Sequence, residues 1–189
     1  MSNEATGADA RSAALDAGPL GYLALGLTLL SYGVLQTGVL SGTSTAHAAG
    51  LAHFVGGIAL FIAGLWQFRS GDTFGGTAFA GLGAFWLTWA AGVGAGGGGK
   101  HAAGLFLLVW TLLALTLAAA SWHSGLFSRG VYGLLTISLL LAAIGTFAGS
   151  DGLVKAAGWV AAVSGLISWY WATAALTNSG WGRAALPVK

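Results

Sequence analysis

The chain alternates long apolar stretches with short polar interruptions. No Asp, Glu, Lys or Arg occurs between Asp16 and Arg69 or between Asp72 and Lys100, and later charges are spaced widely too. A helix that crosses a bilayer needs about 20 predominantly apolar residues, and the uncharged segment 41–50 divides the first interval into two spans. The pattern predicts six membrane-spanning helices, at residues 20–40, 51–68, 77–95, 102–121, 131–148 and 156–176.

Short connections between these helices predict one compact domain. We assign residues 19–178 to a six-helix transmembrane domain, residues 1–18 to a polar N-terminal segment and residues 179–189 to a C-terminal tail. The first residues do not resemble a cleavable signal peptide, so the first span is expected to direct insertion. The even-numbered spans open with similar sequences, HFVGG, KHAAGL and KAAGW, which favours three two-helix hairpins around a central path.

Composition supports an all-α integral membrane protein. Only 6% of residues are charged, 56% are hydrophobic and the mean hydropathy is +0.80, which is too apolar for a soluble domain of this size. Five basic residues fall on the N-terminal side of the predicted membrane and two on the other: Arg11, Arg69, Arg129, Arg183 and Lys189 against Lys100 and Lys155. This bias predicts a multi-pass protein of the cell (inner or plasma) membrane with both termini in the cytoplasm.

The pI of 9.2 therefore reflects topology, and no nucleic-acid partner is expected. The chain has no cysteine, which excludes disulfides. The pair Arg69 and Asp72 is predicted to occupy a cytoplasmic turn, with the arginine at a helix C-terminus and the aspartate capping the next helix.

Groups that could carry chemistry are scarce. No carboxylate, lysine or arginine lies inside a predicted span, and His53 is the one candidate for a proton relay, although an interfacial histidine bonded to backbone or water is the favoured interpretation. Histidines are not paired as haem ligands, and the GVGAGG sequence at 92–97 fits a dinucleotide motif without the strand that the motif requires. We therefore expect no enzyme activity, no metal and no cofactor.

The interior of the spans is neutral and polar at scattered positions. Hydroxyls there can line a narrow path for a small polar solute, or can bond to their own helix or a neighbouring one. The candidates for pore lining or substrate contact are Thr28, Thr88, Thr136, Thr146, Ser164 and Ser168. The residues alone predict a six-helix channel or transporter for a small solute, and leave the solute and the oligomeric state open.

Residues 54–88, FVGGIALFIAGLWQFRSGDTFGGTAFAGLGAFWLT, carry a resemblance. This stretch resembles the acetate uptake transporter family, and GPLGY at 18–22, LAAIGTFAG at 141–149 and the C-terminal WGRAALPVK agree with other family motifs in the same order. The resemblance implies six helices around a path in each protomer, a homohexamer in the lipid bilayer, and transport of acetate and similar small carboxylates.

The resemblance also implies a hydrophobic constriction made by a Phe, a Tyr and a Leu. These map to Leu25, Leu82 and Leu135, so this chain keeps only the last. The three positions lie at a similar depth in spans one, three and five, which supports a ring, whereas lipid-facing or packing leucines are the alternative.

Other departures from the family pattern make the path less polar. Asp16 replaces an Asn, Leu60 replaces a Gln and Thr146 replaces an Asn. We interpret the chain as a channel or transporter for acetate and other short monocarboxylates, with facilitated passage favoured over a titrating relay. The alternatives are a passive channel for a neutral solute such as urea or a short amide, and a membrane protein without a pore.

Overall fold

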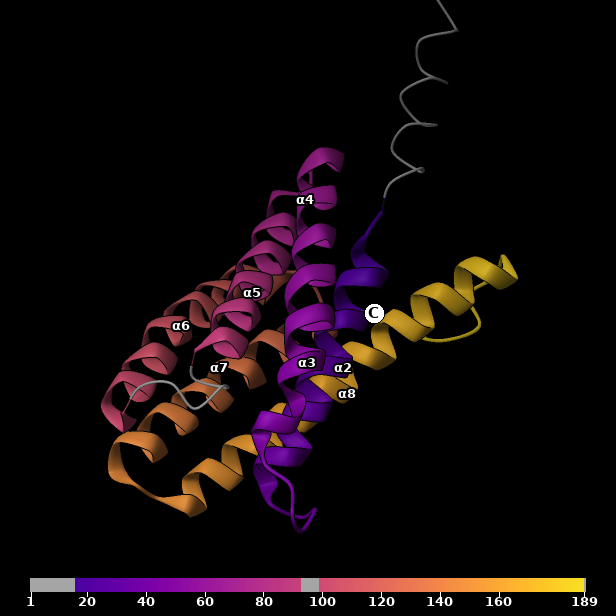
Figure 1. Ribbon diagram of the computed structural model, residues 1–189. Coiled ribbons are helices and arrows are strands. Elements are labelled where there is room, and N and C mark those ends of the chain that lie inside the picture. The colour runs from indigo at the N-terminus through magenta and orange to yellow at the C-terminus, as the bar shows by residue number, and fades with distance from the viewer. Residues whose placement is uncertain (1–15, 93–98, 189) are drawn as a thin grey trace, which may run out of the picture.

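The computed structural model describes residues 16–92 and 99–188. Most of the predicted N-terminal segment, nearly all of the GVGAGG sequence and Lys189 lie outside these residues. Within them, the chain forms six long helical rods and no strand, as Figure 1 shows. The prediction of an all-α membrane protein with six helices is therefore confirmed.

The first two rods differ in their regularity. The first is α2, Gly18–Thr37. The second is continuous from Thr45 to Ser70 and passes through four segments: η1 (Thr45–Ala48), α3 (Ala49–Leu51), the π-helix η2 (Ala52–Ala59) and α4 (Leu60–Ser70). π-helical turns are rare and widen the helix locally, so this rod is the irregular one among the six.

The remaining rods are regular α-helices. They are α5 (Thr73–Ala91), α6 (Lys100–Ala120) followed by the short turn η3 (Ser121–His123), α7 (Leu126–Ala148) and α8 (Asp151–Trp181). Among the described residues, five rods are long and apolar enough to cross a membrane. The exception is α5, because its many glycines, threonines and tryptophans lower its mean hydropathy.

The turn between α4 and α5 forms as its residues predict. Arg69 lies in the last turn of α4, and Gly71 ends that helix with a φ of 88°, a conformation that favours glycine. Asp72 is the N-cap of α5, and its Oδ1 accepts a hydrogen bond of 2.9 Å from the Gly75 amide. This cap starts α5 at Thr73, four residues before the predicted span.

The packing joins each predicted hairpin to the next. The most extensive contact joins α8 to α2, and α7 packs against both α8 and α6, while α5 packs against α4 and η2. By contrast, α5 and α6 are neighbours in sequence but make few contacts. Aromatic rings bridge them instead: Phe85 lies 5.7 Å from Phe106 and 5.5 Å from Trp110 between ring centroids.

Glycines bring α2 and α8 into backbone contact. A methyl group added to Gly26 would lie 2.9 Å from the Gly165 carbonyl oxygen, and one added to Gly33 would lie 2.6 Å from the Gly158 carbonyl oxygen. Such close approach supplies packing where lipid provides little hydrophobic force. The crossing fixes α2, whose buried face forms part of the core.

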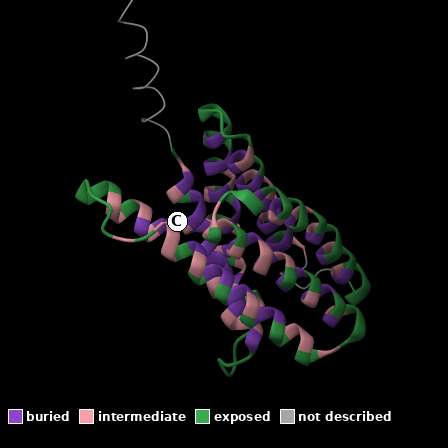
Figure 2. Ribbon diagram, turned by 180° about the vertical axis from the view of Figure 1, so that it is seen from behind, coloured by how far each residue is buried: buried purple, intermediate pink, exposed green. Residues whose placement is uncertain are grey.

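The outer surface is apolar and the buried residues lie inside the bundle. Figure 2 shows exposed positions along the outward faces and at the helix ends, with buried positions between the helices. Leucines on α6 such as Leu105, Leu112 and Leu115 are exposed, as expected for a face that meets lipid or another protomer. A soluble monomer rarely exposes so much contiguous apolar surface.

Candidate functional site

The three predicted constriction leucines are all buried in the core. Leu25 on α2, Leu82 on α5 and Leu135 on α7 are 0%, 1% and 1% exposed and belong to one buried cluster. Their burial is inconsistent with lipid-facing positions, and core-packing leucines stay the alternative to a constriction. We call these three residues the leucine ring; that the ring is the narrowest point of a path stays a prediction.

An aromatic layer lies one helical turn before the ring. Tyr22, Phe79 and Tyr132 each stand three residues before a ring leucine, on the same face of the helix, and all three are buried. The centroid of the Tyr22 ring is 5.2 Å from that of Phe79 and 6.3 Å from that of Tyr132. These contacts show that α2, α5 and α7 converge here. We call the end of the bundle at which these three helices begin the near side.

Three hydroxyls meet in this layer. Tyr132 Oη donates a hydrogen bond of 3.4 Å to Tyr22 Oη, and Tyr22 Oη lies 3.4 Å from Ser128 Oγ. Trp171 of α8 covers the group, with its ring centroid 4.5 Å from that of Tyr22. Sequence reasoning missed these tyrosines because an aromatic residue in an apolar span is normally a packing residue; their spacing from the ring leucines was the available signal.

A pocket on the near side leads to these hydroxyls. It has a volume of about 340 Å³ and is lined by residues 123–128, Trp171 and Val188. Ser128 and Trp171 belong both to the pocket wall and to the hydroxyl layer. The pocket is therefore a candidate vestibule.

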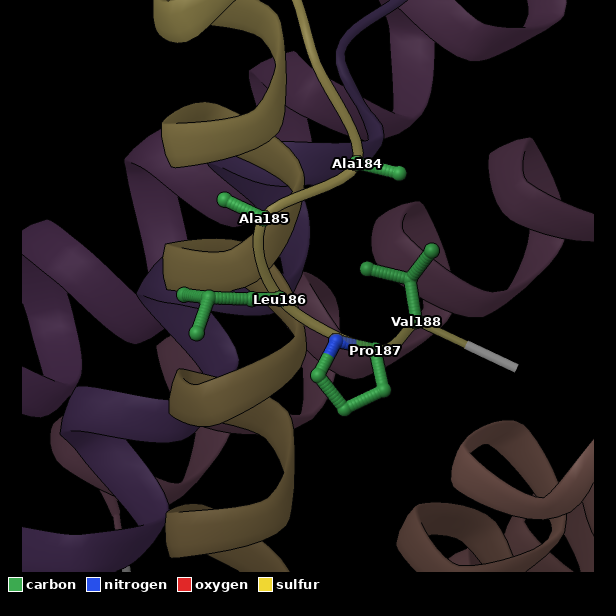
Figure 3. Close-up of a pocket in the computed structure, with 5 residues that line it drawn as sticks. All are labelled: Ala184, Ala185, Leu186, Pro187 and Val188. Atoms are coloured by element: carbon green, nitrogen blue, oxygen red, sulfur yellow. The ribbon is translucent and has the colours of Figure 1, made fainter.

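The C-terminal tail reaches this pocket because Asn178 holds it. The Asn178 amide accepts hydrogen bonds of 2.8 Å from the backbone N–H groups of Ala185 and Leu186 and donates one of 2.8 Å to the Leu186 carbonyl. The segment 184–188 consequently turns back along α8 and encloses a second, shallow pocket (Figure 3). Val188 is thereby brought to the vestibule wall.

The predicted threonines bond to their own helices. Thr28 is fully buried, and its hydroxyl donates to the Ala24 carbonyl at 2.8 Å. Thr88, Thr136 and Thr146 make the same bond to the carbonyl four residues earlier, and Thr88 lies on the exposed face of α5. Their hydroxyl oxygens remain available as acceptors, so a role in lining a path stays a prediction, and the structure does not gather them at one point.

The two predicted serines connect helices. Ser164 and Ser168 on α8 are fully buried; Ser164 Oγ donates to the Val131 carbonyl at 2.9 Å, and Ser168 Oγ donates to the Tyr22 carbonyl at 2.7 Å. These bonds tie α8 to α7 and to α2 beside the aromatic layer. Both serines therefore position the layer, and Ser168 fixes the backbone of Tyr22 itself.

A buried indole lies on the other side of the leucine ring. Trp86 stands one turn after Leu82 and is 1% exposed, and among the described residues its Nε1–H has no hydrogen-bond partner. Tyr32 and Trp89 surround it, with ring centroids at 5.4 and 5.7 Å. An unpaired buried donor is costly, so Trp86 is a candidate contact for a solute.

The structure accounts for two of the departures from the family pattern, Asp16 and Leu60. Asp16 Oδ1 accepts hydrogen bonds from the Gly18 amide at 2.8 Å and from Gln67 Nε2 at 3.2 Å, so it holds the start of α2 against α4. Leu60 is fully buried in the core. The His53 ring is half-buried in η2 and packs against Phe54.

The sequence from residue 4 to residue 187 matches the model of the GPR1/FUN34/yaaH family. The chain belongs to that family. It is 31% identical over 177 residues to the succinate-acetate/proton symporter SatP of Escherichia coli, covering 90% of this chain and 93% of the relative. It is also 30% identical to the ammonia transport outward protein 2 of Saccharomyces cerevisiae, covering 85% of this chain and 61% of that protein.

A solved structure of the bacterial acetate channel SatP has the same fold. The TM-score is 0.85 at 28% sequence identity, over 92% of this chain and 98% of the other. The resemblance inferred from the sequence motifs is thus confirmed. The protein is a multi-pass membrane transporter of the GPR1/FUN34/yaaH family and not an enzyme.

Proposed function

We propose that the protein carries acetate and other short monocarboxylates across the cell membrane, through the point at which α2, α5 and α7 converge in each protomer. The observation that carries this proposal is the set of buried, uncharged polar groups on both sides of the leucine ring. Hydroxyls precede the leucine ring, and an unpaired indole N–H follows it. The names of its relatives, a succinate-acetate symporter and an acetate channel, support the same solute class.

The chemistry of the passage favours facilitated movement. In the part of the chain that the structure describes, the buried polar groups are uncharged: the side chains of Thr, Ser and Gln, the phenol hydroxyls of Tyr22 and Tyr132, and indole N–H groups such as that of Trp86. A carboxylate that leaves water must receive hydrogen bonds in return, which hydroxyls and the indole N–H can supply. A proton that accompanies the solute would travel on the carboxylic acid itself, because the passage provides no acidic or basic relay.

We further propose that both termini are cytoplasmic and that the near side faces the cytoplasm, because five of seven basic residues fall on that side. We also propose a homohexamer, for which the exposed leucines of α6 provide an apolar contact surface. Mass measurement of detergent-purified protein tests the hexamer. A stable, fully active monomer would contradict it.

A neutral solute is the second candidate. The leucine ring suits an uncharged molecule such as urea or a short amide, and one relative is named for ammonia transport. Uptake of labelled acetate and of labelled urea into proteoliposomes separates the candidates. We expect acetate uptake. Uptake of urea without acetate would favour the neutral-solute channel, and uptake of neither would indicate a protein without a pore.

A further inference from the structure

We propose that Tyr22, Ser128 and Tyr132 form a binding site for the carboxylate group of the solute, on the near side of the leucine ring. The inference rests on the proposed function and adds the place at which carboxylates are selected. In this arrangement, carboxylates are selected on the near side, beside the ring, and the ring acts as a barrier to water.

The hydroxyls are close to one another but weakly bonded. Each of the two contacts is 3.4 Å long, whereas O–H···O bonds in proteins are typically about 2.7–2.8 Å. A carboxylate oxygen accepts shorter bonds of about 2.5–2.7 Å from hydroxyls, because its charge strengthens them. A carboxylate bound between the phenols would therefore replace two poor neutral bonds with charge-assisted ones.

The two helices present these groups from a fixed geometry. Ser128 and Tyr132 are four residues apart on α7 and so share one face, which is directed at Tyr22 on α2. Ser168 holds the Tyr22 carbonyl at 2.7 Å, so the backbone that carries the phenol is anchored to α8. A donor set fixed in advance costs little reorganisation when a ligand binds.

Aromatic rings enclose the hydroxyls and limit the size of the solute. Phe79 meets Tyr22 edge to face at 5.2 Å, Phe74 meets Tyr132 edge to face at 5.5 Å, and Trp171 covers Tyr22. Ring edges carry partial positive charge and ring faces accept a methyl group, which suits both ends of acetate. A longer acyl chain would have to displace a ring.

The vestibule gives access to this site. His123, Ser128 and Trp171 form part of the pocket wall, and the exposed Arg129 follows Ser128 in the first turn of α7. Arg129 stacks its guanidinium over Trp122 at 5.8 Å, which places a fixed positive charge near the entrance. Such a charge raises the local concentration of anions.

The test removes the phenol hydroxyls without changing the ring packing. We would compare Tyr22→Phe, Tyr132→Phe and the double variant with the wild type by acetate uptake into proteoliposomes. Each single variant should raise the half-saturation concentration about tenfold, the typical value of one hydrogen bond to a charged group, with little change in the maximal rate. Thr116→Val, which removes a hydroxyl on the exposed face of α6, should leave both values unchanged.

Binding is measured separately by magnetisation transfer from detergent-solubilised protein to the methyl protons of acetate. Transfer should occur with the wild type and be lost in the double variant. If the folded double variant keeps the wild-type half-saturation and transfer signal, the carboxylate site is overturned. If the wild type binds acetate but transports none, the proposed function fails and the binding site stands.

Discussion

In this chain the polar residues of the central layers lie at different positions from those in the family pattern. The family pattern would place a phenol in the ring, at position 82, but this chain has a leucine there and presents its phenols one turn away, at positions 22 and 132. Polar contact and steric constriction are thereby separated along the path. Substitution of a ring leucine should alter the size of the opening and leave carboxylate recognition intact.

Leu82→Trp should reduce acetate uptake to background, because Leu82 is 1% exposed and the packed core around it leaves no free volume for an indole. Leu82→Ala should raise acetate flux, at a stability cost of about 2–5 kcal/mol. Uptake by purified protein in vesicles measures both effects, after size-exclusion chromatography confirms assembly. Leu115→Trp is the matched control, since Leu115 is 54% exposed. Normal transport by assembled Leu82→Trp would refute the ring.

His53→Gln should retain most of the acetate flux. The imidazole is half-buried in η2 and contacts a neighbouring phenylalanine, outside the convergence of α2, α5 and α7. Flux should be compared across a pH gradient, with wild-type protein in parallel vesicles. Complete loss of uptake in a well-folded variant would assign this histidine to a proton relay and refute facilitated passage without one.

At the scale of helices, the sequence predicts the number of spans better than their boundaries or their internal hydrogen bonding. Lipid requires about 20 apolar residues per span, so six spans are visible in the charge spacing. The start of α5 was predicted four residues too late because hydropathy averaging ignores the Asp72 cap. No residue pattern signals the i→i+5 bonding of η2, and α8 extends to Trp181 because polar residues past the bilayer can continue a helix.

The candidate site was predicted only in part, because contacts between distant helices leave no local pattern in the sequence. A family pattern identifies the ring leucines, and burial agrees with it. The partners of Ser164 and Ser168, in contrast, lie on other helices, so only a three-dimensional arrangement reveals that these serines connect helices. The hydroxyl layer likewise depends on Tyr22 and Tyr132, which are far apart in the sequence.

The crossing of α2 and α8 should tolerate no side chain. Gly165→Ala would put a methyl group 2.6 Å from the Leu30 amide nitrogen, so we expect a large fall in the thermal unfolding temperature and loss of assembly. Gly133→Ala is the control: Gly133 is also helical but has no neighbour within 4 Å of an added methyl, and alanine there should be neutral or stabilising by about 0.5–1 kcal/mol. Equal melting temperatures for the two variants would show that the crossing is not a close contact in the membrane.

For the whole molecule, the charge bias predicts an orientation that fusions can measure. Reporter proteins inserted at Ser70, between α4 and α5, and at Ser124, between α6 and α7, should read cytoplasmic, whereas one at Thr43, between α2 and η1, should read external. Each site should carry alkaline phosphatase in one fusion and a fluorescent protein in another. Because the two reporters are active on opposite sides of the membrane, each fusion controls for the expression of the other. The opposite pattern at all three sites would place the vestibule outside the cell.

The folded-back tail has a practical consequence for anyone who purifies this protein. Asn178 directs the segment 184–188 to the vestibule, so a histidine tag or fluorescent label joined after Lys189 would begin two residues after Val188, a residue of the vestibule wall. Steric crowding or metal-binding imidazoles at that point would alter measured uptake without any change in the passage itself. A cleavable label at the N-terminus avoids this interference. Uptake measured before and after cleavage of a C-terminal label would show how much that label changes the rate.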